Sequence, residues 1–217
     1  MSYLMVHLTI GYKLLEIYPE IEDKGAFLLG TISPDAIMFR SGCERSDKSK
    51  THFCIGDEEW GFYTNYNEWM ENLIKNINSF YHSVNTDFLF GYMCHIITDI
   101  ENTRCFWTPA RLSNDDIYQR AYLKDCEEID SILLNTYINA DELWTLLEAS
   151  NKHCLKDLYS IEDNSIMIEK MKSEIYYNRY PTPGYTPSSF TIPKVSKFMD
   201  EVIGKILMYK QSMFDKD

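Results

Sequence analysis

The pattern of apolar and polar positions is helical along most of the chain. In residues 3–18 apolar side chains recur three and four positions apart and form one stripe, which Pro19 closes. The same spacing predicts a helix over residues 60–81. Residues 88–100 are apolar on nearly all sides, which predicts a buried central helix that ends at Pro109. No stretch alternates with a period of two, so no strand is predicted.

The remaining segments complete the prediction of an all-α fold. "GAFLLGTISPDAIMFR", residues 25–40, predicts a short buried helix broken at "SPD", because a residue that precedes proline is pushed out of the helical region. Residues 41–58 are polar and turn-rich and predict a loop. Further helices are predicted near 114–136, 140–158, 163–177 and 193–213. We therefore expect a helical bundle of about seven to eight helices.

The length of 217 residues suits a single helical domain, residues 1–217, with no internal repeat. Residues 1–107 hold the candidate metal ligands described below, and residues 108–217 form a helical second half. A segment rich in Pro, Gly and Tyr, residues 176–190, interrupts the second half. Loops of this length either cover a site as a lid or serve as packed connectors.

Composition and charge narrow the classes of partner. Apolar residues make up 45% of the chain, enough for a substantial core, and the formal net charge is −12. This charge argues against a nucleic-acid backbone as a non-specific partner, although a metal ion could reverse the local field for a phosphate-bearing substrate. The six cysteines contain no CxxC pair, which excludes a zinc ribbon and indicates reduced thiols.

The N-terminal stretch lacks the basic region of a signal peptide, and no stretch approaches the ~18 apolar residues of a membrane span. We therefore expect a soluble cytoplasmic protein.

The central helix carries two residues that could bind a metal, His95 and Asp99. Four residues apart, they lie about 40° apart around the helix axis and leave the same face. Buried polar groups are costly unless they have partners, so the two either satisfy each other and nearby hydroxyls or face a metal ion. A second His-x-x-x-Asp match, His153 and Asp157, has polar neighbours and predicts a solvated helix face.

Three more residues of metal-ligand type precede this helix. His7 lies on the apolar stripe of the first helix, where it is either a satisfied core histidine or a ligand. Asp35 stands at the "SPD" turn, either as the N-cap of the following segment or as a ligand. His52, in "THF", is by itself an ordinary loop histidine. Imidazole and carboxylate are the ligands of hydrolytic Zn²⁺, so the joint occurrence of these residues favours a metal site.

The ordered motifs "HLTIGYKLLE", "FLLGTISPDAIMF", "KTHF" and "FLFGYMCHIITDI" resemble the zinc-dependent phospholipase C family over residues 5 to about 107. That family is all-helical and related to the fungal single-strand nucleases, which cleave phosphoesters with a zinc cluster. The resemblance thus implies a helical fold of the phospholipase C and single-strand-nuclease type.

Residue by residue, the resemblance implies a ligand set. His52, His95 and Asp99 would be ligands of one zinc ion. Asp35 would stand beside that ion, either as a ligand or as the catalytic base that orients the attacking water. His7 would join Asp99 on a second ion, with the carboxylate bridging the two.

The resembling family binds a further zinc through two histidines and a glutamate beyond the central helix, whereas this chain has only His153 there. We therefore expect one or two zinc ions and not a third. The expected activity is metal-dependent hydrolysis of a phosphoester, such as a small phosphodiester or a phospholipid headgroup, by metal-activated water. The alternative is a non-catalytic helical module that binds the metal. An HD-type phosphohydrolase is excluded, because none of the five histidines is followed by aspartate.

Overall fold

The computed structural model describes residues 4–54, 63–113, 116–177 and 179–214. Within these ranges there are ten α-helices and no strand, which confirms the all-α prediction. The two helices that the pattern did not predict are short: α3 (Arg45–Thr51) and α6 (Thr108–Leu112). None of the described helices is long and apolar enough to cross a membrane.

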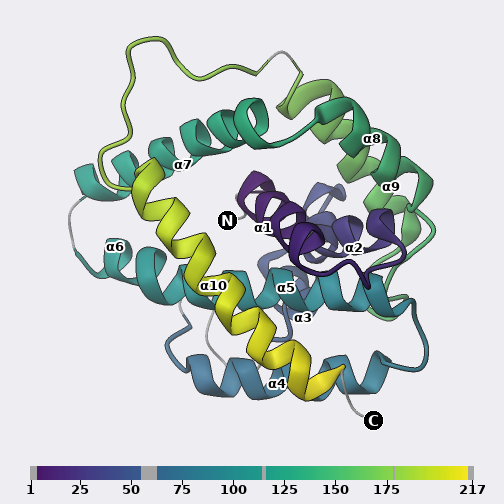
Figure 1. The fold of residues 1–217 in the computed structure, drawn as a ribbon. Coiled ribbons are helices and arrows are strands. Elements are labelled where there is room, and N and C mark those ends of the chain that lie inside the picture. The colour runs from purple at the N-terminus through teal and green to yellow at the C-terminus, as the bar shows by residue number, and fades with distance from the viewer. Residues whose placement is uncertain (1–3, 55–62, 114–115, 178, 215–217) are drawn as a thin grey trace.

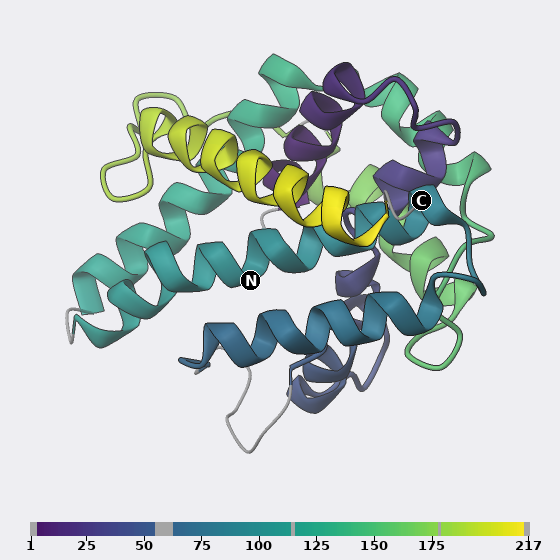
Figure 2. The same cartoon turned by 60° about the horizontal axis from the view of Figure 1, so that its bottom comes forward.

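Helix α5 (Thr86–Asn102) is the predicted central helix, and every residue from its third position onward is buried. It begins at Asn85, whose side chain accepts a hydrogen bond from the backbone N–H of Phe88. Figures 1 and 2 show α4 (Tyr66–Phe80) lying alongside α5 and α10 (Ile192–Met213) crossing it. The apolar run is therefore covered by neighbouring helices, as its lack of a polar face requires.

Helix α2 (Lys24–Gly30) packs against α5 with backbone almost touching backbone. A Cβ atom on Gly30 would lie 2.2 Å from the backbone oxygen of Phe88, and one on Gly91 would lie 2.1 Å from that of Phe27. Any side chain at either glycine would push the two helices apart, so this contact depends on both of them.

The N-terminal elements follow the predicted pattern. Helix α1 (Leu4–Ile17) matches the stripe predicted over residues 3–18. After α2 the chain enters a 3₁₀ helix, η1 (Ser33–Phe39), with Pro34 in its first turn. The predicted break at "SPD" is thus confirmed, and it separates α2 from η1.

The prediction of a loop over residues 41–58 is wrong over residues 45–51, which form α3. Its N-cap is Glu44, which forms a capping box with Asp47. Glutamate is uncommon at N-cap positions, so the start of this polar helix carries no ordinary sequence signal. Residues 55–58 lie outside the described residues.

Pro109 does not end the central helix as predicted. Helix α5 passes into a π-helical turn, η2 (Thr103–Trp107), and then into α6. Pro109 lies in the first turn of α6. A proline is tolerated there, because the first N–H groups of a helix have no intrahelical partner.

The second half contains α7 (Asp116–Tyr137), α8 (Ala140–Ala149), α9 (Ile161–Lys170) and the π-helical turn η3 (Met171–Ile175). Helix α8 ends at Ala149, well before the predicted residue 158. His153 and Asp157 therefore lie outside any helix, so the prediction of a helix face there is wrong. The His153 ring stacks on Phe88 instead, with 5.8 Å between the ring centroids.

Helix α7 holds the Pro- and Tyr-rich segment through buried carboxylates. Asp125, which is 0% exposed, accepts hydrogen bonds from the Tyr185 hydroxyl and from the backbone N–H groups of Ser188, Ser189 and Phe190. One turn further along α7, Glu128 accepts a hydrogen bond from the backbone N–H of Thr182. These contacts support the packed-connector alternative for this segment.

Candidate metal centre

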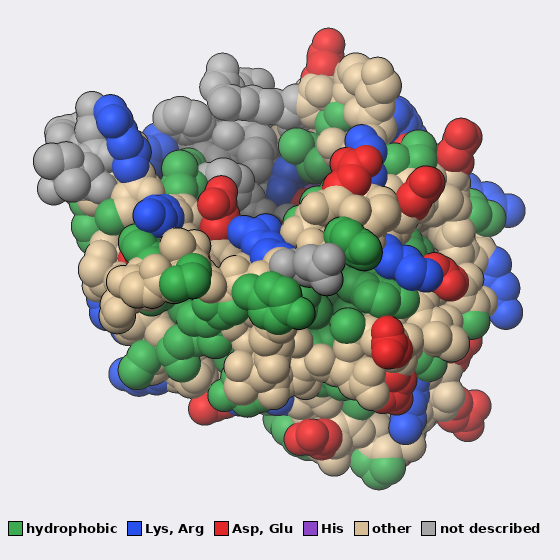
Figure 3. Space-filling view, turned by 90° about the horizontal axis from the view of Figure 1, so that it is seen from above, with side chains coloured by type: hydrophobic (Ala, Val, Ile, Leu, Met, Phe, Trp, Pro, Cys, Tyr) green, Lys and Arg blue, Asp and Glu red, His purple; other side chains and the backbone are tan. Residues whose placement is uncertain are grey.

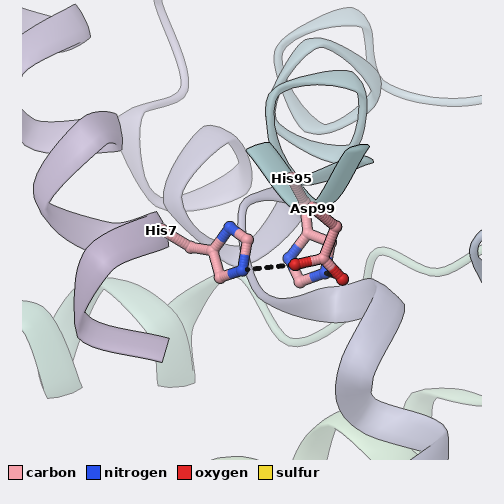
Figure 4. Close-up of side chains that lie close together, drawn as sticks. All are labelled: His7, His95 and Asp99. Atoms are coloured by element: carbon pink, nitrogen blue, oxygen red, sulfur yellow. Dashed lines mark ion pairs between the residues drawn. The ribbon is translucent and has the colours of Figure 1, made fainter. Parts of the chain in front are cut away.

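The five predicted ligand residues lie together, and all of them are buried, with exposed fractions between 0 and 4%. They come from four different elements: His7 from α1, Asp35 from η1, His52 from the end of α3, and His95 and Asp99 from α5. Figure 4 shows the His7 ring pointing from α1 toward His95 and Asp99. The dashed line marks the ion pair between His7 and Asp99.

Three of these side chains place one atom each at the corners of a small triangle. The Nε2 atoms of His52 and His95 are 3.1 Å apart. Oδ2 of Asp99 lies 3.3 Å from the His52 nitrogen and 3.7 Å from the His95 nitrogen. Ligand atoms bound at ~2.0–2.1 Å around a tetrahedral zinc ion lie ~3.4 Å from one another. The triangle therefore has the size of one face of a zinc coordination tetrahedron.

Asp35 and His7 approach this triangle from two sides. Asp35 Oδ1 lies 3.4 Å from His52 Nε2, and Asp35 Oδ2 lies 4.0 Å from His95 Nε2. The His7 ring stacks on the His95 ring, with 3.9 Å between the centroids, and its Nε2 lies 3.3 Å from Asp99 Oδ1. Two overlapping groups thus have the spacing to hold a metal: His7–His95–Asp99 and Asp35–His52–His95.

Backbone carbonyl groups fix the tautomers of two of the histidines. Nδ1 of His52 lies 2.9 Å from the carbonyl oxygen of Lys48, and Nδ1 of His95 lies 2.7 Å from that of Thr31. A carbonyl oxygen only accepts hydrogen bonds, so each neutral ring carries its proton on Nδ1. The Nε2 lone pairs then point at each other and at Asp99, as they do in imidazoles that bind a metal.

The glycine contact between α2 and α5 places one of these carbonyl groups. Gly30 directly precedes Thr31, and Gly91 lies one turn before His95 on α5. Because the two backbones approach at these glycines, the Thr31 carbonyl reaches the His95 ring. The glycines of "FLLG" and "FLFG" therefore act on the site through backbone geometry.

The end of α3 turns the "THF" segment inward. Helix α3 ends with His52 as its C-cap, and Phe53 follows with a positive φ of 55°. The N–H of Cys54 donates to the carbonyl of Ser49, and the N–H of Phe53 donates to that of Lys50. This pair of hydrogen bonds is a Schellman motif, with phenylalanine at the position where glycine is usual.

Two aromatic side chains hold this turn against the core. The Tyr92 hydroxyl donates to the carbonyl of Thr51 at 2.6 Å, and the Trp69 indole N–H donates to the carbonyl of His52 at 2.7 Å. Tyr92 belongs to α5 and Trp69 to α4, so both helices fix the position of His52. The His52 side chain is fully buried.

Lys48 is a member of the cluster that the sequence did not predict. Its Nζ lies 2.5 Å from Asp35 Oδ1, and the residue is only 3% exposed. Asp35 therefore pairs with a lysine and does not cap η1, whose N-cap position is Ile32. Lys48 and His52 are four residues apart on α3, a spacing that would have indicated their proximity if the segment had been predicted as a helix.

The charges of the cluster follow from its contacts. Burial raises the pKa of Asp35, but the positive charge around it, above all the Lys48 ammonium, lowers it by more, so this pKa lies well below its usual value. Burial also raises the pKa of Asp99, but the surrounding imidazole cluster, in which His7 Nε2 can donate to Asp99 Oδ1, lowers it by more, so this pKa also lies well below its usual value. Burial lowers the pKa of His95 well below its usual value, and the neighbouring His7 adds to this effect. Both carboxylates are therefore ionised, and His95 is neutral.

The residues fit a bound cation. Oδ2 of Asp35 and Oδ2 of Asp99 have no hydrogen-bond partner among the described residues. In the part of the chain that the structure describes, two carboxylates of the cluster oppose one ammonium, which leaves one buried negative charge. An uncompensated buried charge is costly, and so are lone pairs that face lone pairs. A zinc ion among these nitrogen and oxygen atoms would remove both costs.

Comparisons with known proteins give a family match for the first half of the chain. Residues 6–100 match the family model described as zinc dependent phospholipase C. The matched range contains all five candidate ligands, so the resemblance predicted for the first half is confirmed. No significant match was found among curated proteins or solved structures.

Proposed function

We propose that the protein is a zinc-dependent hydrolase that cleaves a phosphoester in the manner of a phospholipase C. The observation that carries the proposal is the buried triangle of His52 Nε2, His95 Nε2 and Asp99 Oδ2, with edges of 3.1, 3.3 and 3.7 Å. The family match over residues 6–100 supports the same chemistry.

In this proposal His52, His95 and Asp99 hold the zinc ion, and His7 supports Asp99 through its other oxygen. When bound, zinc lowers the pKa of a coordinated water and offsets negative charge on a phosphoryl group. Asp35 then serves as the base, because its Oδ2 faces the cluster without a hydrogen-bond partner among the described residues. Lys48 holds the other oxygen of Asp35 and so fixes the orientation of the base.

The proposed substrate is a small phosphodiester or a phospholipid headgroup rather than a nucleic acid. The formal net charge of −12 opposes a polyanionic partner. On the face seen in Figure 3, acidic and basic side chains surround a band of apolar ones, and the described residues there form no concentrated basic patch. The six cysteines are free thiols, which supports a reducing, cytoplasmic location as part of the proposal.

A metal-binding module without catalysis is the second candidate, and one observation favours it. All five candidate ligands are at most 4% exposed, as is typical of metal ions that stabilise a fold. In a module of this kind the metal would be needed for folding, and no phosphoester would be turned over.

The experiment measures zinc content and hydrolysis on the same purified protein. We expect bound zinc by elemental analysis and turnover of bis(p-nitrophenyl) phosphate or phosphatidylcholine, both lost on chelation. His95→Ala should lower hydrolysis at least ~100-fold, since it removes a ligand. The matched control is His153→Ala, which removes a histidine outside the cluster and should change neither zinc content nor hydrolysis.

The two candidates give different results. Zinc that is required for folding, with no hydrolysis of either substrate, would favour the module over the enzyme. A purified protein that binds no zinc would contradict both.

A further inference from the structure

The candidate metal centre contains a fixed positive charge of its own. The Lys48 ammonium lies 2.5 Å from Asp35 Oδ1 and is as deeply buried as the candidate ligands. A buried lysine is costly unless a negative partner compensates it, and Asp35 provides that partner. In the cluster, therefore, one of the two carboxylates is already paired with a cation.

The two groups that could hold a metal share one residue. Both His7–His95–Asp99 and Asp35–His52–His95 include His95. Because Nδ1 of His95 donates to the Thr31 carbonyl, the ring has a single lone pair, on Nε2, to offer. His95 can therefore serve one ion at a time, and a second ion would have fewer ligands from the described residues.

The charge balance of the cluster also favours a single bound ion. Among the described residues of the cluster, two carboxylates and one ammonium sum to −1, so one divalent ion brings this sum to +1. A second divalent ion would bring it to +3 inside a buried site. Like charges a few ångströms apart repel strongly where water is excluded, so the second ion would bind poorly.

We propose that Lys48 takes the place of a second metal ion, so that the site holds a single divalent ion beside a permanent ammonium. The inference rests on the proposed zinc site and fixes its stoichiometry. In two-metal phosphoesterases the second ion adds positive charge near the phosphoryl oxygens. Here the Lys48 ammonium, anchored on Asp35, supplies that charge.

The test counts ions rather than turnover. Co²⁺ is titrated into metal-free protein, and its visible absorption and native mass spectra report how many ions bind. Wild type should saturate at one equivalent. Lys48→Met removes the charge, keeps a long side chain and frees Asp35 Oδ1, so this variant should bind two equivalents. Lys50→Met is the matched control on the same helix, because Lys50 is exposed and its ion pair is with Asp47, outside the cluster; it should bind one.

Each outcome separates the inference from the proposed function. Two ions in wild type would overturn the inference and leave the zinc enzyme standing, as would a folded Lys48→Met that binds one. No ion in wild type would overturn the proposed function together with the inference. Thermal melting checks that Lys48→Met folds; if it does not, the wild-type stoichiometry decides, since one ion supports the inference and two contradict it.

Discussion

Buried carboxylates in the two halves of the molecule are satisfied in opposite ways. In the second half, Asp125 accepts four hydrogen bonds, from a tyrosine hydroxyl and three consecutive backbone N–H groups. In the first half, Asp35 and Asp99 each keep one oxygen without a hydrogen-bond partner among the described residues, and these oxygens face imidazole nitrogens. All three aspartates are at most 4% exposed.

The difference separates a structural network from a binding site. A carboxylate that is fully hydrogen-bonded by its own chain stabilises the fold and needs nothing further. A cluster in which acceptors face acceptors is incomplete, and it persists only because the surrounding packing holds it in place. The four elements that converge on the first-half cluster supply that packing.

The largest expected effect comes from paired alanine substitutions. Asp125→Ala leaves three N–H groups and a hydroxyl without their acceptor, so it should lower the free energy of unfolding by about 4 kcal/mol, with or without zinc. Asp99→Ala should change the stability of metal-free protein by less than ~1 kcal/mol. It should abolish the added stability that zinc gives wild type, about 4 kcal/mol at a free concentration ~1,000 times the Kd.

Urea unfolding with and without a chelator measures both variants. A large loss of stability in metal-free Asp99→Ala would mean that the first-half cluster is a structural network too, and the comparison would fail.

Asp130, in the second half, lies between the two kinds of buried carboxylate, because only one of its oxygens has a hydrogen-bond partner among the described residues. The Tyr176 hydroxyl donates to its Oδ2, while its Oδ1 has no hydrogen-bond partner among the described residues. Burial raises the pKa of Asp130 from 3.8 to about 7, against the lowering by the Tyr176 hydrogen bond. The partner of this carboxyl is a tyrosine hydroxyl and not an imidazole, so we expect it to be satisfied by a proton instead of a metal.

The sign of the pH dependence follows. Between pH 4 and 7 the folded protein binds a proton at Asp130 that the unfolded chain has lost, so the free energy of unfolding falls as pH rises. The loss, complete above pH 7, should reach about 4 kcal/mol. Urea unfolding from pH 4 to 8 should show this slope in wild type and a flatter one in Asp130→Asn. Asp200→Asn, at an exposed ion pair, should keep the wild-type slope; equal slopes in all three proteins would contradict the assignment.

Gly91→Ala should have a smaller effect on stability, combined with an effect on the site. The added Cβ would lie 2.1 Å from the backbone oxygen of Phe27. Separating α2 from α5 should cost about 3 kcal/mol and move the Thr31 carbonyl away from His95. We therefore expect zinc affinity to fall at least ~10-fold, as for other losses of a group that orients a ligand.

The matched control is Gly204→Ala on α10, where a Cβ meets nothing within 4 Å. It should raise stability by up to ~1 kcal/mol, because alanine favours a helix over glycine. Unchanged zinc affinity in Gly91→Ala would show that the helix contact does not position His95.

The sequence predicted the helices correctly where the apolar pattern extends over many residues. Helix α5 was predicted from its continuous apolar run, and His95 and Asp99 stood out because polar residues are rare in such a helix. His7 and Asp35 were predicted as candidate ligands for the same reason. His52 was predicted as a ligand through the family resemblance. The part of this site that the sequence pattern predicts is therefore the set of polar residues with apolar neighbours.

The rest depends on contacts that residue patterns do not carry. Helix α3 starts at an unusual N-cap, Glu44, and ends with a phenylalanine, Phe53, in the left-handed region. Because of both features the sequence pattern does not predict this helix. The ion pair of Lys48 with Asp35, which depends on the helix, was therefore not predicted either. The acceptor role of Asp125 was equally hidden, because three of its four partners are backbone N–H groups, which every residue but proline has.

The smallest expected effect is that of Tyr185→Phe, which removes one of the four donors to Asp125. The hydrogen bond to Asp125 raises the pKa of Tyr185 to about 12, so the hydroxyl stays a donor at neutral pH. Its loss should cost about 1 kcal/mol in urea unfolding and leave zinc affinity and hydrolysis unchanged. Tyr180→Phe, at an exposed tyrosine, should change nothing. A fall in kcat/KM in either variant would instead make residues 179–190 a lid that contacts substrate, and the second half would then share in the site.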